Sequence, residues 1–310
     1  MRILVVGAGA IGGYFGGRLL QAGQDVTFLV RPKRAGELAS AGLVIRSPLG
    51  DVTIPNPPTV QADKLQEALH DKFDVVLLSC KAFDLDDAIA SFAPAVGPGT
   101  AIIPMLNGMR HLDVLEAKFG ADAVLGGQCK IAATLNEARE VVQLAPLQSL
   151  SFGERKGGSS ARIEAIATIM ASGNFGGTAS DNIMQDMWEK WIFLATIAGA
   201  TSAMRAAVGD IVGAPGGRDF ILGVRDECSA VASANGFAPR AAFLDGATAM
   251  LTAEGSKMTA SMYRDILNNA AIEADQIIGD LIARADAAKA PVPRLRMIYT
   301  HLKAYEAQRG

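Results

Sequence analysis

The chain has 310 residues, of which 50% are hydrophobic and 20% are charged, and its formal net charge is −3. This length favours two domains, because single hydrophobic cores stop growing near about 250–300 residues. The small net charge gives no electrostatic attraction to nucleic acid or to an anionic membrane, so we expect neither as a partner.

Targeting signals and disulfides are not expected. No apolar run reaches the roughly 20 residues that a membrane-spanning helix needs, and glycines interrupt the N-terminal apolar run where a signal peptide would continue. The three widely spaced cysteines do not form a disulfide framework and fit a reducing compartment. We therefore expect a cytoplasmic protein.

Strand-length apolar runs alternate with helix-like segments in the first half of the chain. The expected strands are residues 3–6, 26–30, 75–79, 101–104 and 123–126. The expected helices are residues 11–22, 34–41, 65–69, 85–92 and 111–119. This alternation predicts a parallel sheet built from βαβ units, and the continuous apolarity of the strands predicts that both faces are covered.

The pattern changes twice further along the chain. Residues 139–154 predict two strands around a turn at Pro146, followed by a helix capped by Ser159 or Ser160 and a last strand over 174–179. From Asp181 onward alanine, methionine and helical periodicity dominate, and no strand is expected. The sequence thus predicts an α/β domain over residues 1–180 and an all-helical domain over 181–310.

A glycine series, Gly7-x-Gly9-x-x-Gly12, follows the first expected strand and opens the first helix. Gly7 permits a tight turn, Gly9 lets a pyrophosphate approach the backbone, and Gly12 lets the helix pack on the strand. The pyrophosphate would sit on the N–H groups at the helix start. A merely glycine-rich turn is the alternative, but the context favours a Rossmann-type dinucleotide site formed by Gly7, Ala8, Gly9, Ala10, Ile11 and Gly12.

The end of the second expected strand indicates which cofactor binds. An NAD site places an acidic residue there for the ribose 2′-hydroxyl, whereas basic residues accommodate a 2′-phosphate. This chain has Arg31, Lys33 and Arg34 at that point and no acid. The sequence therefore predicts NADP(H), with a solvated basic loop as the alternative.

Two polar residues follow later strands, at the edge where ligands of open α/β sheets bind. Lys81 could reach a phosphate or a ribose, and Asn107 could bind the nicotinamide ribose or the substrate. Each signal is weak alone, because Asn-Gly is an ordinary turn and a lysine after a strand is usually exposed.

Over essentially its whole length the sequence resembles the ketopantoate reductase (2-dehydropantoate 2-reductase) family. The resemblance depends on the order and spacing of several motifs: ILVVGAGAIGGYFGGRL, Arg31, SCKAFD and LNGM in the first half, then WEKWIFLATIAGATSA, SMYRDI and IEADQIIGDLIARADAAKAPVP. It implies a doubly wound Rossmann-type domain, a helical domain like that of 6-phosphogluconate dehydrogenases, and an active site in the cleft between them.

The resemblance also implies an activity and roles for single residues. The activity is NADPH-dependent reduction of a 2-oxo acid, most simply 2-dehydropantoate to pantoate for pantothenate synthesis, with no metal. By motif position, Lys190 is the proton donor and Glu273 its acidic partner. The remaining roles are substrate contact for Ser261, cofactor and substrate contact for Asn107, and cofactor contact for Lys81 and the backbone of Ala132.

The pattern departs from the family on the helix that carries Lys190. Family members have asparagines four and eight residues after the lysine, whereas this chain has Leu194 and Ala198. These positions lie on nearly the same helix face as Lys190. An apolar face cannot hydrogen-bond a substrate hydroxyl, so we expect 2-dehydropantoate to be a poor substrate.

Two other functions stay open at this point. The chain could be a related 3-hydroxyacid or opine-type dehydrogenase acting on a less polar substrate, or a non-catalytic NADP(H)-binding sensor. The helical domain could also form a homodimer interface in addition to a core.

Overall fold

The computed structural model describes residues 1–67 and 72–309. The chain divides into two compact units, the first formed by Met1–Leu106 with His111–Ile183 and the second by Asn107–Arg110 with Met184–Gly310. The sequence predicts residues 107–110 to lie in the first domain. They group with the second unit because Asn107 makes hydrogen bonds to Lys190 and Gln276.

The first unit is built on a parallel five-stranded sheet, which confirms the predicted α/β class. Its spatial order is β5-β2-β1-β6-β7, with bounds β1 Arg2–Val6, β2 Asp25–Leu29, β5 Thr59–Val60, β6 Val75–Leu78 and β7 Ala101–Pro104. Every residue of β6 and β7 is buried, as expected for strands covered on both faces. From β1 the chain adds strands first on one side, as β2 and β5, and then on the other side, as β6 and β7. Parallel sheets bind ligands at this switch point, between β1 and β6.

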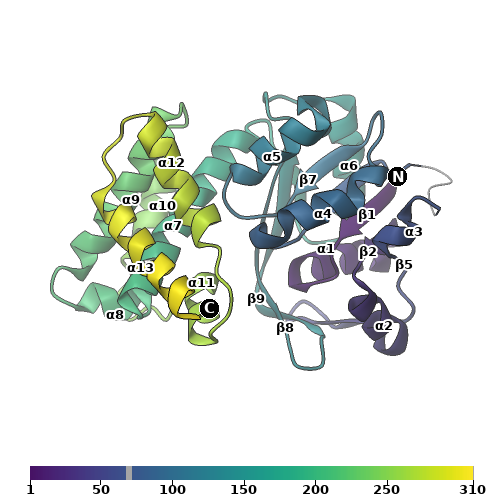
Figure 1. The fold of residues 1–310 in the computed structure, drawn as a ribbon, viewed down its shortest axis with the longest axis horizontal. Coiled ribbons are helices and arrows are strands. Elements are labelled where there is room, and N and C mark those ends of the chain that lie inside the picture. Colours follow the sequence, from purple (N-terminus) through teal and green to yellow (C-terminus); the bar gives the residue numbers. More distant parts are fainter. Residues whose placement is uncertain (68–71, 310) are drawn as a thin grey trace. The chain divides into compact units, whose positions relative to one another are not determined.

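Several helices accompany these strands in the first unit (Figure 1). Their bounds are α1 Ala10–Gln21, α2 Pro32–Ala41, α3 Ala62–Leu65, α4 Leu85–Phe92, α5 Arg110–Phe119 and α6 Ala161–Ser172, with short 3₁₀ turns η1 Ala82–Asp84, η2 Ala93–Ala95 and η3 Ala121–Ala123. Of the two possible caps of α6, Ser160 is the one whose side chain accepts from the Ile163 N–H. Helix α3 begins before the predicted range 65–69, and residues 68 and 69 lie outside the described part of the chain.

Helix α1 packs between the main sheet and a second sheet. A Cβ atom on Gly16 would lie 2.7 Å from the Phe28 ring of β2, and one on Gly17 would lie 2.7 Å from Ile45 of β3. Because Gly16 and Gly17 have no Cβ, α1 can pack closely against both sheets.

The second sheet has the order β10-β9-β3-β4, and β8 also pairs with β9. Its strands are β3 Leu43–Arg46, β4 Val52–Ile54, β8 Gly126–Leu135, β9 Val141–Gly153 and β10 Gly177–Ala179. Strands β3, β4 and β5 were not predicted, because runs of two to four residues carry little periodic signal.

Two strand predictions in this region were wrong. Residues 139–154 do not form two strands around Pro146, since β9 is one continuous strand. Ile131 pairs with Gln148 while Ala133 pairs with Gln143, so residues 144–147 bulge out of the ladder. A bulge needs no ladder N–H, which is why it accepts a proline. The strand expected over 123–126 begins only at the end of that range, as β8.

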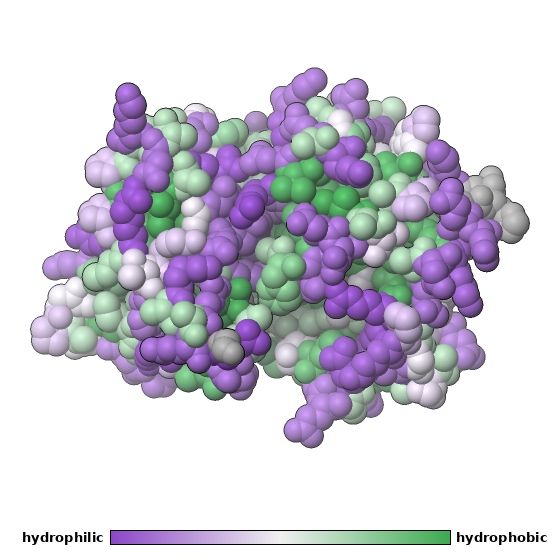
Figure 2. All heavy atoms as spheres, viewed as in Figure 1, coloured by the Kyte–Doolittle hydropathy of each residue, from purple (hydrophilic) through white to green (hydrophobic). Residues whose placement is uncertain are grey.

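The second unit is helical, and no strand occurs in its described residues (Figure 1). Its elements are α7 Ile183–Met204, α8 Val208–Gly213, α9 Gly217–Ala234, α10 Ala241–Leu251, α11 Ser261–Leu267, the π-helix η4 Asp275–Gly279, α12 Asp280–Ala287 and α13 Pro293–Arg309. Trp188 and Trp191 of α7 lie in its core. The described helices include none that is both long and apolar enough to cross a bilayer. On the face shown in Figure 2, hydrophilic residues separate the apolar areas.

Candidate functional site

A cavity of about 560 Å³ lies in the first unit at the carboxyl ends of β1, β2 and β6. This is the edge at which the strand order predicts a ligand. Its lining contains several of the residues predicted to bind the cofactor: Gly7, Ala8, Gly9, Arg31 and Lys81. Ala10, Ile11 and Gly12 form the first turn of α1 beside it.

The three glycines of the motif have different local geometries. Gly7 has a φ of +94°, which disfavours any side chain. A Cβ on Gly12 would lie 2.1 Å from the Gly7 carbonyl oxygen and 2.2 Å from Ser79 Oγ, whereas a Cβ on Gly9 would meet no atom within 4 Å. Gly9 thus leaves open space at the start of α1, where no side chain caps the helix. These residues fit a pyrophosphate bound to the backbone N–H groups.

Two of the three predicted cations line this cavity. Arg31 Nη2 lies 2.7 Å from Asp84 Oδ1, and the hydrogen bond and charge of Asp84 raise the pKa of Arg31. Arg34 Nε donates to the Ala8 carbonyl oxygen at 3.0 Å, which ties the basic segment to the glycine loop. Lys33 is exposed.

A further cation at this cavity, Arg139, was missed by the sequence analysis. It lies in the turn between β8 and β9, with a φ of +63°. Its Nε is 3.2 Å from Glu37 Oε2, the same oxygen that Arg34 Nη1 reaches at 3.0 Å. The hydrogen bond from Arg34, with a smaller contribution from Arg139, lowers the pKa of Glu37. Two guanidinium groups therefore share one carboxylate at the cavity edge.

In the second unit the structure brings Lys190 and Asn107 together. Lys190 lies in α7, is half-buried, and its Nζ donates to Asn107 Oδ1 at 3.2 Å. The Asn107 backbone oxygen accepts from Gln276 Nε2 at 2.8 Å. The following Gly108 has a φ of +77°, so Asn107 enters a turn that favours glycine.

The other predicted residues have more varied positions. Glu273 is half-buried just before the π-helix, and Ser261 is the half-buried first residue of α11. Leu194 is half-buried one helical turn after Lys190, whereas Ala198 is 0% exposed. Of these two positions, Leu194 is therefore the one with accessible apolar surface. Ala132 lies in β8 of the first unit, at the register shift opposite β9.

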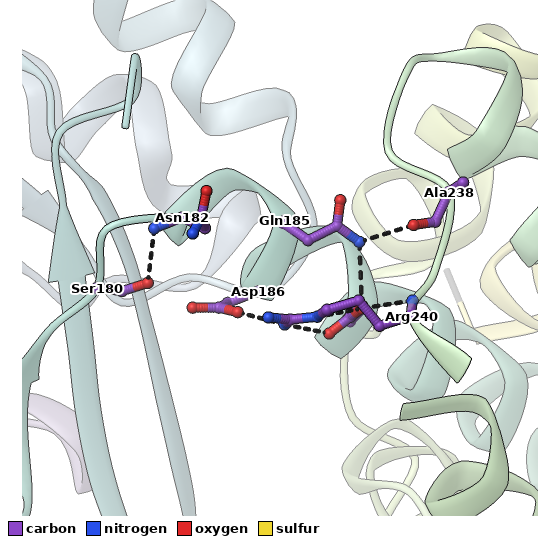
Figure 3. Close-up of polar contacts among 7 residues, drawn as sticks. Ser180, Asn182, Gln185, Asp186, Ala238 and Arg240 are labelled. Atoms are coloured by element: carbon purple, nitrogen blue, oxygen red, sulfur yellow. Dashed lines mark hydrogen bonds and ion pairs between the residues drawn. The ribbon is translucent and has the colours of Figure 1, made fainter. Parts of the chain in front are cut away.

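An ion pair between the buried Glu189 and the exposed Arg240 anchors the part of α7 that carries Lys190 (Figure 3). The Glu189 carboxylate accepts from the Arg240 backbone N–H and from Arg240 Nε, both at 2.9 Å, and from Gln185 at 3.1 Å. Arg240 also contacts Asp186. Burial alone would raise the pKa of Glu189, but the hydrogen bonds from Arg240 lower it. The charged carboxylate thus holds the start of α10 against α7.

Comparison with known proteins gives the family. The model of the family described as ketopantoate reductase PanE/ApbA matches residues 3–157, and the model of its C-terminal part matches residues 182–306. The chain is similar to an uncharacterised oxidoreductase, YkpB, of Bacillus subtilis (strain 168), with 35% identity over 309 residues covering 100% of both chains. It is also 26% identical to a 2-dehydropantoate 2-reductase of Halobacterium salinarum, over 96% of each chain.

A solved structure shows the same fold. The 2-dehydropantoate 2-reductase from Geobacter metallireducens GS-15 superposes with a TM-score of 0.88 at 27% identity, covering 98% of this chain and 99% of that one. This likeness agrees with the Rossmann-type sheet and the helical second unit described above. The chain therefore belongs to the ketopantoate reductase family and is an oxidoreductase of that family.

Proposed function

We propose that the protein reduces a 2-oxo acid to a 2-hydroxy acid with NADPH, and that 2-dehydropantoate is the simplest substrate that its family suggests. The observation that carries the proposal is the hydrogen bond between Lys190 and Asn107. It places a half-buried ammonium group on the helical unit of a chain whose other unit has a cavity of about 560 Å³ lined by the glycine motif.

The residues around the cavity favour NADP(H) over NAD(H). Arg31, Arg34 and Arg139 line this cavity. Arg31 lies two residues after the end of β2, where an NAD site has an acidic residue. Guanidinium groups bind phosphate oxygens through paired, charge-assisted hydrogen bonds. We propose that Arg34 and Arg139 contact the 2′-phosphate and that Glu37 holds both in place beforehand.

Lys190 is proposed as the proton donor. When bound, NADPH would supply the hydride for the carbonyl carbon, and the resulting alkoxide oxygen would need a proton and a positive neighbour. An ammonium group has three donors, and one of them is used by Asn107. We propose that the same ammonium group donates to the substrate oxygen, and that Glu273 is the acidic partner that keeps the lysine charged.

The substrate is proposed to be less polar than 2-dehydropantoate. Leu194 lies one turn from Lys190 and offers no hydrogen bond, whereas Ser261 offers one hydroxyl. A site that hydrogen-bonds a substrate hydroxyl discriminates strongly in its favour, and an apolar site does not. We expect kcat/KM for 2-dehydropantoate to be lower than for a 2-oxo acid with an apolar side chain, and equal values would contradict this.

The proposal is tested by NADPH oxidation with a panel of 2-oxo acids. Lys190→Met should bind NADPH as the wild type does and should not turn over. The matched control is Lys257→Met, because the Lys257 side chain is 85% exposed and lies outside the proposed site. Normal turnover by Lys190→Met would show that Lys190 is not the proton donor. NADPH binding without reduction of any acid in the panel would instead support a sensor.

A further inference from the structure

The helix that follows Glu273 begins with a π-turn. Residues Asp275–Gly279 form the π-helix η4, in which the Asp280 N–H bonds to the Asp275 carbonyl oxygen five residues earlier. A π-turn adds one residue to the helical ladder and changes which side chains face a given neighbour. Such turns are rare in proteins, and those that occur are often at functional sites.

One residue of this turn, Gln276, holds the segment that carries Asn107. Gln276 is 5% exposed, and its Nε2 donates to the Asn107 backbone oxygen at 2.8 Å. Its own carbonyl oxygen lies so close to Gly108 that a Cβ there would be 2.7 Å away. Both the side chain and the backbone of Gln276 therefore fix the Asn107–Gly108 turn.

The same π-turn also contacts the helix that carries Lys190. The indole Nε1 of Trp191, the residue after Lys190, donates to the Ile277 carbonyl oxygen at 3.0 Å, and Trp191 is 1% exposed. Asn107 and the neighbour of Lys190, Trp191, are thus hydrogen-bonded to adjacent buried residues of one π-turn, Gln276 and Ile277.

We propose that Gln276 is a positioning residue for the proton-donating lysine. It fixes the backbone at Asn107 so that the Asn107 side-chain oxygen meets Lys190 Nζ, and it acts through Asn107 without touching the substrate. The inference rests on the proposed function of Lys190. Misplacing a catalytic group by about 1 Å can lower the rate about a hundredfold. Even a smaller displacement of Lys190 should therefore lower kcat measurably.

The test removes the amide and keeps the volume. Gln276→Met should lower kcat at least about tenfold and leave the KM for NADPH nearly unchanged, because neither Gln276 nor Asn107 lines the cavity proposed for the cofactor. The matched control is Gln143→Met, which removes another buried glutamine that donates to a backbone oxygen, Leu147 O at 3.2 Å. Gln143→Met should keep the wild-type kcat. If Gln276→Met does not fold, Gln276→Asn is used instead. Its side chain keeps the amide but is too short to reach the Asn107 backbone oxygen, so the same loss of kcat is expected.

A double-mutant cycle separates positioning from general stability. In an Asn107→Ala background, Gln276→Met should cause no further loss of kcat, because the group that it positions is absent. An equal further loss in that background, or a kcat within about twofold of wild type for a folded Gln276 variant, would overturn the role of Gln276. Wild-type turnover is measured first. Its absence would overturn the proposed function together with this inference, whereas the other two outcomes leave the proposed function standing.

Discussion

Gly12→Ala should destabilise the protein and Gly9→Ala should leave its stability nearly unchanged, and both should impair cofactor binding. The two glycines lie three residues apart in the same motif, but their surroundings differ. A Cβ on Gly12 would lie 2.1 Å from the Gly7 carbonyl oxygen, and one on Gly9 would meet nothing within 4 Å.

The magnitudes follow from these distances. The Gly12 substitution forces backbone apart, and such overpacking costs about 1–3 kcal/mol, or a Tm lower by about 2–10 °C. Gly9 has φ −80° and ψ −161°, which alanine adopts freely. Its substitution should change stability by less than about 1 kcal/mol, because a small capping loss offsets the stabilisation that comes from a lower unfolded-state entropy. The Cβ added at Gly9 would lie where the pyrophosphate is expected to contact the backbone, so Gly9→Ala should weaken NADPH binding about 10–100-fold.

The assay combines thermal unfolding with a fluorescence titration of NADPH for each variant. Gly9→Ala should unfold like the wild type and bind NADPH poorly, while Gly12→Ala should lose both properties. Normal NADPH binding by a stable Gly9→Ala protein would show that the pyrophosphate does not lie on this turn, and the reasoning from the open space would fail.

Other features of the structure give further predictions. Arg34→Gln and Arg139→Gln should each weaken NADPH binding about tenfold in titrations and affect NADH binding little, since both are partly exposed and are proposed to contact the 2′-phosphate; an equal loss for both cofactors would argue against a 2′-phosphate site. The lowered pKa of Glu189 means that its contribution to stability is full above the unfolded pKa, near 4.3, and is lost as pH falls through the folded value. The Tm advantage of wild type over Arg240→Met should therefore be full at neutral pH and shrink below about pH 4, and a pH-independent difference would refute this. Cys80, which lines the cavity and is partly exposed, should react with a thiol reagent before the two buried cysteines, and NADPH should slow it; unchanged labelling with NADPH would contradict the placement of the cofactor.

Local signals in the sequence pointed to residues that line the cavity of the first unit. The glycine spacing has a mechanical meaning at each position, and it lies directly between a strand and a helix, so Gly7, Gly9 and Gly12 could be interpreted without knowing any distant contact. The same holds for Arg31 and Arg34, which come immediately after a strand. The alternation of strands and helices likewise predicted the parallel sheet.

Long-range contacts explain what the sequence could not show. Arg139 reaches the cavity because a hairpin turn 102 residues away from Glu37 returns to α2. Gln276 is 169 residues from Asn107, and no local pattern links them. The bulge at Pro146 was taken for a turn, because proline signals a break in a ladder but not whether the strand continues beyond it.

The most direct test of the central claim follows the hydride. NADPH carrying deuterium at the transferable C4 position of the nicotinamide is incubated with the preferred 2-oxo acid, and the product is analysed by mass spectrometry and proton NMR. The proposed function predicts a 2-hydroxy acid with deuterium on its C2 carbon from the wild type, and none from Lys190→Met. A 2-hydroxy acid without deuterium at C2, or no product with any 2-oxo acid while NADPH binds, would contradict it.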